Sequence, residues 1–297
     1  MATLREIRGR IAGVKKTQKI TRAMKMVAAA KLRRAQNAVV AARPYARKLK
    51  ELLQHLAANV DITVNPFIAP REVKSVALVV VTSDRGLCGA FNSNLLRAAI
   101  SHINTKYPTG QDQGTLKTFC VGKKGFDLFS KRKHKIAGRY LGVYSNLVFG
   151  QAQAIAREII DGYAHGEYDR VEIIYNEFKS IAQQRIVVEQ FLPIPKEEVV
   201  AGEPHASRRT DYIYEPGMLE IMNSLVPKHL NFQVWRVILE SNAAEQGARM
   251  AAMENATTNA SDLISSLQLS YNKARQAAIT KELLEIVAGA EALKKAG

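Results

Sequence analysis

The chain has 297 residues, of which 47% are hydrophobic, and a formal net charge of +16. This length accommodates one large or two ordinary domains, and the composition is that of a folded globular protein. No apolar stretch approaches the ~20 residues that a bilayer-spanning helix needs, and the first residues do not predict a secretory signal. The positive charge indicates an acidic partner, which would be nucleic acid, anionic lipid or an acidic protein surface.

The first 57 residues carry 15 Lys or Arg and only two acids, Glu6 and Glu51. They are rich in strong helix formers, so we predict one basic helix over residues 1–58, which would be roughly 80 Å long. Its apolar residues recur at steps of three and four, and we interpret the irregular stretches 14–20 and 27–32 as phase slips in this seam. Two prolines after residue 64 mark the end of the segment.

Residues 73–195 alternate between strand and helix patterns, which predicts a parallel α/β sheet. Strands are expected near 76–81, 116–121, 136–141, 171–175 and 186–191. Helices are expected over 92–107 and 148–164, and a further one begins at the Gly-Lys-Lys-Gly sequence 122–125. Residues 196–216 form a polar loop.

The chain becomes helical again from residue 217, and we expect Pro227 to separate a short helix from a long one. Residues 228–297 hold 14 alanines and no proline, and residues 216–297 have eight basic and eight acidic side chains. Small residues on a helix let a second helix approach closely. The sequence therefore predicts an antiparallel coiled coil of the two terminal helices, with the α/β domain inserted at one end.

No catalytic, cofactor or metal site is expected. The turn Gly86–Gly89 follows a strand, as phosphate-binding loops do, but it lacks both glycine-rich phosphate motifs, so we favour a tight structural turn. The six histidines have no metal-ligand spacing, and no nucleophile elbow is present. Cys88 and Cys120 lie 32 residues apart and are interpreted as buried or neutral thiols. The pattern is typical of a nucleotide-binding fold that lacks phosphate-binding and catalytic residues.

The basic N-terminal helix is the strongest functional signal. A solvated surface normally mixes both signs of charge, whereas the excess here is one-sided. One interpretation is a nucleic-acid-binding basic coiled-coil protein, similar to a zipper protein. That alternative requires leucines at every seventh position, which are absent, and it leaves the charge-balanced C-terminal helix and the inserted domain unexplained.

Five stretches carry a resemblance to one family: residues 7–11, 17–31, 83–89, 245–260 and 275–287. They closely resemble the gamma subunit of F-type ATP synthases. The resemblance covers the whole chain and is most specific at both ends. It implies an α/β fold plus a long antiparallel coiled coil. Helices 1–58 and 217–297 form the coiled coil, a Rossmann-like α/β domain over 73–195 lies at its base, and residues 196–216 form a foot.

The resemblance also implies a function. In this family the subunit is the central rotor shaft, which couples rotation of the membrane c ring, driven by proton flow, to conformational cycling of the catalytic β subunits. The implied partners are three α and three β subunits, the epsilon subunit and the c ring. The subunit is present in a single copy, has no catalytic site and binds no nucleic acid. It is peripheral, at the cytoplasmic face of the bacterial inner membrane, and meets the membrane only through the c ring.

The resemblance further assigns roles to particular residues. A catch on one β subunit would involve Arg275 and Gln276. Contacts with an acidic β loop would come from Arg85, Cys88, Arg22 and Lys25. The foot on the c ring would include Arg208, Arg209, Asp211, Tyr212 and Tyr214. The coiled-coil seam would contain Met24, Val27, Ala248, Ala252 and Ala256.

Overall fold

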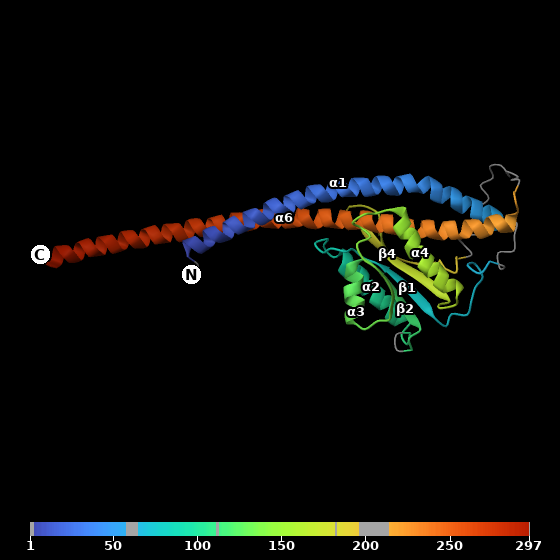
Figure 1. Ribbon diagram of the computed structural model, residues 1–297. Helices are drawn as coiled ribbons and strands as arrows, with labels where there is room; N and C mark the ends of the chain where they lie inside the picture. Colours follow the sequence, from blue (N-terminus) through green and yellow to red (C-terminus); the bar gives the residue numbers. More distant parts are fainter. Residues whose placement is uncertain (1–2, 58–64, 111–112, 182, 196–213, 297) are drawn as a thin grey trace. The chain divides into compact units, whose positions relative to one another are not determined.

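A computed structural model of the chain describes residues 3–57, 65–110, 113–181, 183–195 and 214–296. The chain divides into two compact units, residues 1–27 with 250–297, and residues 28–249. Two long helices, α1 (Leu4–Ala57) and α6 (Met218–Ala296), contribute to both units. The strands and the shorter helices of the described residues lie between them in sequence and belong to the second unit (Figure 1).

The second unit contains one five-stranded sheet with the strand order β3-β2-β1-β4-β5. Its strands are β1 (Val76–Val81), β2 (Leu116–Val121), β3 (Ile136–Tyr140), β4 (Arg170–Phe178) and β5 (Gln184–Leu192). The first four are parallel, but β5 is antiparallel to β4, which corrects the expectation of an all-parallel sheet. Residues 179–183 are too few for the crossover that a parallel neighbour requires, so the chain makes a hairpin instead.

Helices bury both sides of the central strand β1. Ala77, Val79 and Val81 belong to a core with α4 (Phe149–Ala164), α6 and the end of α1. The alternate residues pack against α2 (Phe91–Lys106) and α3 (Lys123–Lys131) on the other side (Figure 1). A strand covered on both sides needs an unbroken apolar run rather than an alternating one, which explains why β1 could be recognised in the sequence.

Pro227 lies inside α6 and does not separate two helices, contrary to the expectation from the sequence. A proline in a helix removes one backbone hydrogen bond and costs ~3 kcal/mol or more. Here its neighbours Val226 and Leu230 are fully buried in the core of the second unit. Packing of this segment holds the helix together across the proline, as it does for Pro44 inside α1.

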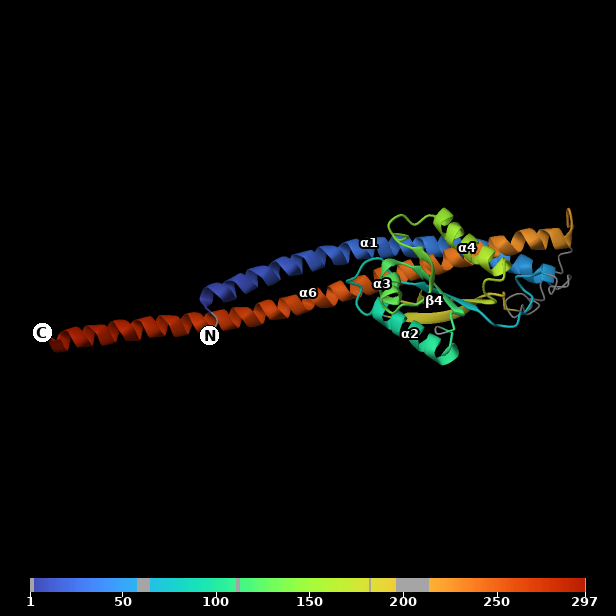
Figure 2. The ribbon, with the colours of Figure 1, turned by 60° about the horizontal axis from the view of Figure 1, so that its bottom comes forward.

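The two long helices are antiparallel within each unit. In the unit 28–249, the ring of Tyr45 on α1 packs at a tilt against Phe232 of α6, with 4.9 Å between ring centroids, and Leu53 shares a core with Val226. In the other unit, where α1 and α6 also run side by side (Figure 2), Thr21 and Thr257 share a hydrogen bond of 2.8 Å. In both units, residues later in α1 contact residues earlier in α6, as antiparallel helices require.

The buried side of α1 follows a regular three-and-four spacing along its whole length, so the predicted phase slips are wrong. The positions that are buried or half-buried at this spacing are Leu4, Ile7, Ile11, Val14, Gln18, Thr21, Lys25, Ala28, Leu32, Ala35, Val39, Ala42, Ala46, Leu49, Leu53 and Leu56. Three polar residues, Gln18, Thr21 and Lys25, occupy the seam between Val14 and Ala28. The prediction followed apolar residues only, so it wrongly included Ile20 and Val27 in the seam. Their side chains are 59% and 56% exposed. Val27 is therefore not a seam residue.

The other predicted seam residues fall into two groups. Ala248 is buried, but it clusters with Cys88, Phe91 and Ala244 beside the α/β sheet, so it is also not a seam residue. α6 has apolar residues on more than one side here, and spacing alone does not tell which side meets α1. Met24, Ala252 and Ala256 are half-buried in the other unit. The best-buried positions of α6 there are Met253, Ala260 and Ile264.

Candidate functional site

The segment Thr82–Ala90 follows β1 at the carboxyl end of the parallel strands. From β1 the chain proceeds to β2 and β3 on one side of the sheet and then to β4 on the other. In open α/β sheets, ligands bind where the strand order reverses in this way. The segment is therefore the place to look for a functional site.

The N-terminus of α3 faces this segment, and oxygen atoms of the chain already occupy it. The Lys123 N–H donates to Asp84 Oδ1 at 3.1 Å, and the Lys124 N–H donates to the Ser83 carbonyl at 3.1 Å. The Gly125 N–H donates to Thr82 Oγ1 at 2.8 Å. Free N–H groups at a helix N-terminus are what bind phosphate in nucleotide-binding folds. Here those donors are used internally.

The approach of α3 to β1 is also too close for a ligand group to enter. Gly122 has φ +95°, and a Cβ atom there would lie 2.0 Å from the Thr82 carbonyl oxygen. The Gly-Lys-Lys-Gly sequence thus provides a tight passage from β2 into α3. Between residues 86 and 89, the left-handed positions are Leu87 and Gly89.

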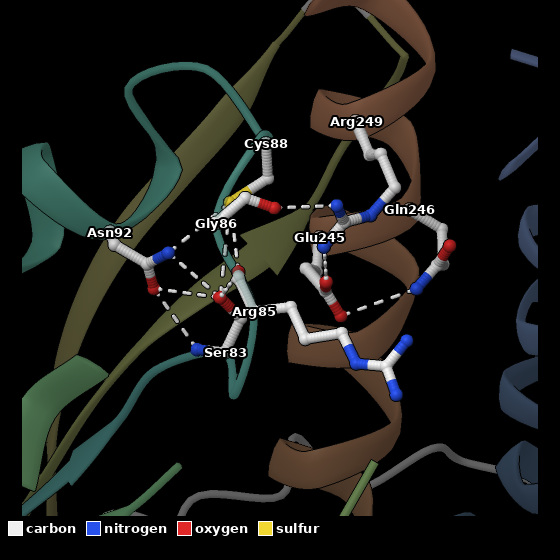
Figure 3. Close-up of polar contacts among 8 residues, drawn as sticks. All are labelled: Ser83, Arg85, Gly86, Cys88, Asn92, Glu245, Gln246 and Arg249. Atoms are coloured by element: carbon white, nitrogen blue, oxygen red, sulfur yellow. Dashed lines mark hydrogen bonds and ion pairs between the residues drawn. The ribbon is translucent and has the colours of Figure 1, made fainter. Parts of the chain in front are cut away.

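A hydrogen-bond network fixes the interior of the segment Thr82–Ala90, which we call the braced loop (Figure 3). The Asn92 amide donates to Ser83 Oγ at 2.7 Å and to Cys88 Sγ at 3.2 Å. The Ser83 N–H donates back to Asn92 Oδ1 at 3.0 Å. Cys88 is only 1% exposed, and burial raises the pKa of its thiol. Cys88 therefore lies inside the loop, which agrees with the expected buried thiol and argues against a surface contact by its sulfur.

α6 braces the outer part of the loop. The Arg249 guanidinium donates to the Gly86 carbonyl at 2.6 Å and forms an ion pair with Glu245 (Figure 3). The two side chains are only 13% and 5% exposed. The Gln246 amide donates to the same carboxylate at 3.2 Å. A buried pair with additional hydrogen bonds holds a rigid geometry, so the loop and α6 form one block within this unit.

The loop Thr82–Ala90 presents two large exposed side chains, Arg85 and Leu87. Leu87 is 67% exposed although its φ is +65°, a conformation that disfavours residues with a side chain. The loop thus holds an apolar and a cationic side chain outwards on a fixed backbone. Such an arrangement suits contact with another surface rather than bond chemistry. Among the described residues, no group of His, Cys, Asp and Glu is suited to hold a metal ion.

The unit formed by residues 1–27 and 250–297 contains most of the other predicted contact residues. Arg22, Arg275 and Gln276 are exposed. Lys25, predicted to face a β subunit, instead makes an ion pair with Glu254 across the two helices, which leaves its side chain 37% exposed. Near the end of α6, large apolar side chains are more than half exposed: Leu283, Leu284, Ile286 and Val287.

The predicted foot is largely beyond reach of the structure. Arg208, Arg209, Asp211 and Tyr212 lie outside the described residues. Tyr214 is described and half-buried, and its ring packs against the core of the second unit and stacks near His55, with 6.5 Å between centroids.

Sequence reasoning missed one buried charged cluster. Glu172 of β4 is 2% exposed and accepts hydrogen bonds from His102 at 2.6 Å and from Lys106, both on α2. Burial opposes ionisation of the carboxyl group, but its partners outweigh burial and hold the pKa of Glu172 below its ordinary value. The signal in the sequence was an acid at the centre of a strand buried on both sides.

Three comparisons with known proteins agree with one another. The model of a family described as ATP synthase matches residues 3–293. The ATP synthase gamma chain of Chloroherpeton thalassium is 53% identical over 302 residues, covering 99% of each chain. That of Chlorobaculum tepidum is 54% identical over 296 residues, covering 99% of this chain and all of the other. A chain from the central stalk and c ring of the Tetrahymena thermophila mitochondrial ATP synthase is 27% identical, with a TM-score of 0.60 over 80% of this chain and 99% of that one.

These relatives do not support the nucleic-acid alternative. Their similarity extends over nearly the whole chain, and it includes the basic N-terminal helix, the loop after β1 and the C-terminal helix together. In the part of the chain that the structure describes, no helix has the length and apolar character of a membrane span. The chain belongs to the ATP synthase gamma-chain family.

Proposed function

We propose that this chain is the central rotor shaft of a proton-translocating ATP synthase. Rotation of the membrane c ring turns the chain, and its changing contacts drive the catalytic β subunits through their conformations. The observation that carries the proposal is the match with gamma chains at 53–54% identity over 99% of this chain.

The antiparallel helices supply the shaft of the proposal. A three-and-four spacing maintained from Leu4 to Leu56 is the pattern of a coiled coil, in which two helices stabilise each other along their length. The α/β unit, with its mostly parallel sheet, corresponds to the Rossmann-like domain at the base. Domain limits of 1–58, 73–195, 196–216 and 217–297 remain part of this proposal.

The mechanism we propose is differential contact. A shaft with different side chains on its different sides stabilises a different set of β conformations at each angle, which couples rotation to catalysis. Exposed Arg22 and Arg85 are suited to meet acidic loops, with Leu87 beside Arg85. Exposed ion pairs contribute only ~0.2–1 kcal/mol each, so no single contact locks the rotor.

We infer that the chain is non-catalytic. The backbone donors at the N-terminus of α3 are satisfied by Asp84, Ser83 and Thr82, which supports a sheet without a phosphate site. The purified chain should not hydrolyse ATP, and it should bind none at the N-terminus of α3. A hydrolysis assay and an ATP titration of the Lys123 and Lys124 backbone amide signals measure this, and turnover or a shift of those signals would contradict it.

The partners in this proposal are three α and three β subunits, the epsilon subunit and the c ring, around a single copy of the chain. Residues 196–216 rest on the c ring, so the chain is peripheral to the membrane. Within this proposal, the chain lies at the cytoplasmic face of a bacterial inner membrane.

Co-purification tests the proposal against its alternative. A tagged chain expressed in its own host should retain α and β subunits, identified by mass spectrometry, in a complex with ATPase activity. The purified chain should also show no more retention on DNA than expected from its charge, with rapid loss as salt rises. Salt-resistant DNA binding without α and β subunits would overturn the assignment.

A further inference from the structure

A groove of about 1060 Å³ lies within the unit 28–249, between α1 and α6. α1 lines it from Arg43 to Glu51, α6 lines it from His229 to Arg236, and Glu189 of β5 closes one side. All of these residues lie outside the braced loop at the end of β1. The volume is at the upper end of the range for small-molecule sites, ~300–1,000 Å³.

The groove has a positive excess that its own carboxylates do not neutralise. Five cationic side chains line it, against the two carboxylates Glu51 and Glu189. Glu51 is shared by Arg47 at 2.9 Å and Lys48 at 2.7 Å, and Glu189 pairs with Arg236 at 2.6 Å. For the other two cations, Arg43 and Lys50, no ion pair with a described residue is found.

His229 of α6 lines this groove together with Lys50 and Arg236. Burial lowers the pKa of His229 to about 4, and the charges of Lys50 on α1 and Arg236 on α6 lower it further. The imidazole is therefore neutral at physiological pH and keeps one N–H to donate. Phe232, which is 8% exposed and packs against Tyr45, supplies an aromatic wall. The groove thus offers uncommitted cations, a neutral donor and an apolar wall around one space.

We propose that this groove binds a phosphate-bearing anion with several negative charges. Guanidinium groups bind phosphate oxygens in pairs, and the excess of three positive charges matches an anion with more than one phosphate group. Such a group occurs both in soluble oligophosphates and in anionic lipid headgroups, and either source presents the same chemistry. The site is independent of the rotor function and of the closed N-terminus of α3.

The pKa of His229 should report whether an anion occupies the groove. A bound anion would place negative charge beside the imidazole, where Lys50 and Arg236 now place positive charge. In the histidine NMR spectrum of the full chain, with the signal identified by His229→Gln, tripolyphosphate at constant ionic strength should raise the pKa of His229 by roughly one pH unit or more. Of the charged groups that line the groove, Lys50 and Arg236 act on His229 directly. The others are Arg43, Arg47, Lys48, Glu51 and Glu189. An unchanged His229 titration would overturn the proposal for soluble phosphates.

Two matched double variants distinguish binding in the groove from non-specific attraction to a positively charged protein. Arg43→Gln/Lys50→Gln removes the two uncommitted cations and should weaken binding of tripolyphosphate at least tenfold. Lys131→Gln/Lys135→Gln removes the same charge at two exposed positions, the last residue of α3 and a residue of the following loop, and should bind as the parent does. Equal weakening by both pairs would show non-specific attraction and overturn the proposal.

Sedimentation with vesicles distinguishes the two sources of phosphate. Binding to phosphatidylglycerol vesicles but not to phosphatidylcholine vesicles, lost in Arg43→Gln/Lys50→Gln alone, assigns the site to a lipid headgroup. Binding of tripolyphosphate without vesicle binding assigns it to a soluble anion, and failure of both rejects the site. The rotor assignment is tested separately, because both double variants should still co-purify with α and β subunits.

Discussion

At the end of β1, the Asp84 carboxylate accepts hydrogen bonds from the Lys123 and Gly142 N–H groups at 3.1 and 2.9 Å. One carboxylate thereby ties the start of α3 to the loop after β3, and it does so at the place where an anion would bind in a related fold. A single acidic residue after the strand is thus enough to turn a ligand site into a structural joint.

Replacing Asp84 should expose this joint. Asp84→Ala should lower the free energy of unfolding by about 1–2 kcal/mol, as loss of a helix-capping acid does. Phosphate should then stabilise the variant more than the parent, because the vacated donors form an anion site. Urea unfolding with and without phosphate measures both effects. Glu72→Ala, at an exposed position, is the control, and equal responses to phosphate in all three proteins would contradict the interpretation.

Glu172 gives a pH dependence of known sign. Its folded pKa is held below the ordinary value of 4.5, so its stabilising effect is full above that pH and is lost as the pH falls towards the lowered folded value. Glu172→Gln should cost about 1.5–3 kcal/mol at pH 7, the range for hydrogen bonds to a charged group. The difference from the parent should shrink below pH 4.5. Unfolding curves from pH 3 to 7 test this.

A matched acid controls for this effect. Glu167 pairs with Lys117 at the surface, so Glu167→Gln should change the stability little at any pH. A pH-independent loss in Glu172→Gln would indicate altered packing rather than a lost charge.

At the level of whole elements, the long helices show which patterns a sequence reveals. The apolar run of β1 and the alternation of strands and helices predicted the sheet, because a buried strand has few alternatives. β5 is antiparallel to β4 because the connection between them is short. The strands were predicted to end and begin at residues 175 and 186, which made this connection look longer than it is. The continuous seam of α1 was missed because Gln18, Thr21 and Lys25 are polar, and their acceptability depends on partners more than 200 residues away.

The braced loop was predictable only in part. The turn after β1 was located, but the contacts from Asn92, Glu245 and Arg249 that hold it depend on tertiary structure. Equally, the sequence did not tell whether Ala248 faces α1 or the sheet. Spacing along one helix identifies its apolar sides but not the element that each side meets.

The polar positions in the seam should fix the register of the two helices. Thr21 and Thr257 share a hydrogen bond of 2.8 Å. Thr21→Val or Thr257→Val alone should each cost about 0.5–1.5 kcal/mol, whereas the double variant should recover most of the loss, because two apolar groups of the same shape replace the pair. A double-mutant cycle measures the coupling. Strictly additive losses would mean that the two hydroxyls act independently.

For the assembled molecule, the exposed cations at the end of the shaft should matter for turnover and not for folding. We expect Arg275→Ala to change the stability of the isolated chain by no more than about 0.5 kcal/mol, as is usual for surface positions. In the assembled enzyme, loss of bidentate bonds to a β carboxylate should slow ATP hydrolysis roughly tenfold, which corresponds to about 1.4 kcal/mol.

The substitution Arg275→Lys separates geometry from charge. Lysine keeps the charge but not the paired donors, so it should remain well below the parent in turnover. Exposed Gln276 should show a smaller effect in the same direction. Normal hydrolysis by an intact Arg275→Ala complex would remove these residues from the proposed catch.

The wide separation of paired residues also affects how a cell makes the protein. Arg8 donates to the Tyr271 hydroxyl at 2.8 Å although 263 residues separate them. Synthesis proceeds at about 5–20 residues per second, so the first helix leaves the ribosome tens of seconds before its partner exists. During that interval its apolar seam has nothing to pair with. We therefore expect the nascent chain to need a chaperone that covers its amphipathic basic helix until translation ends.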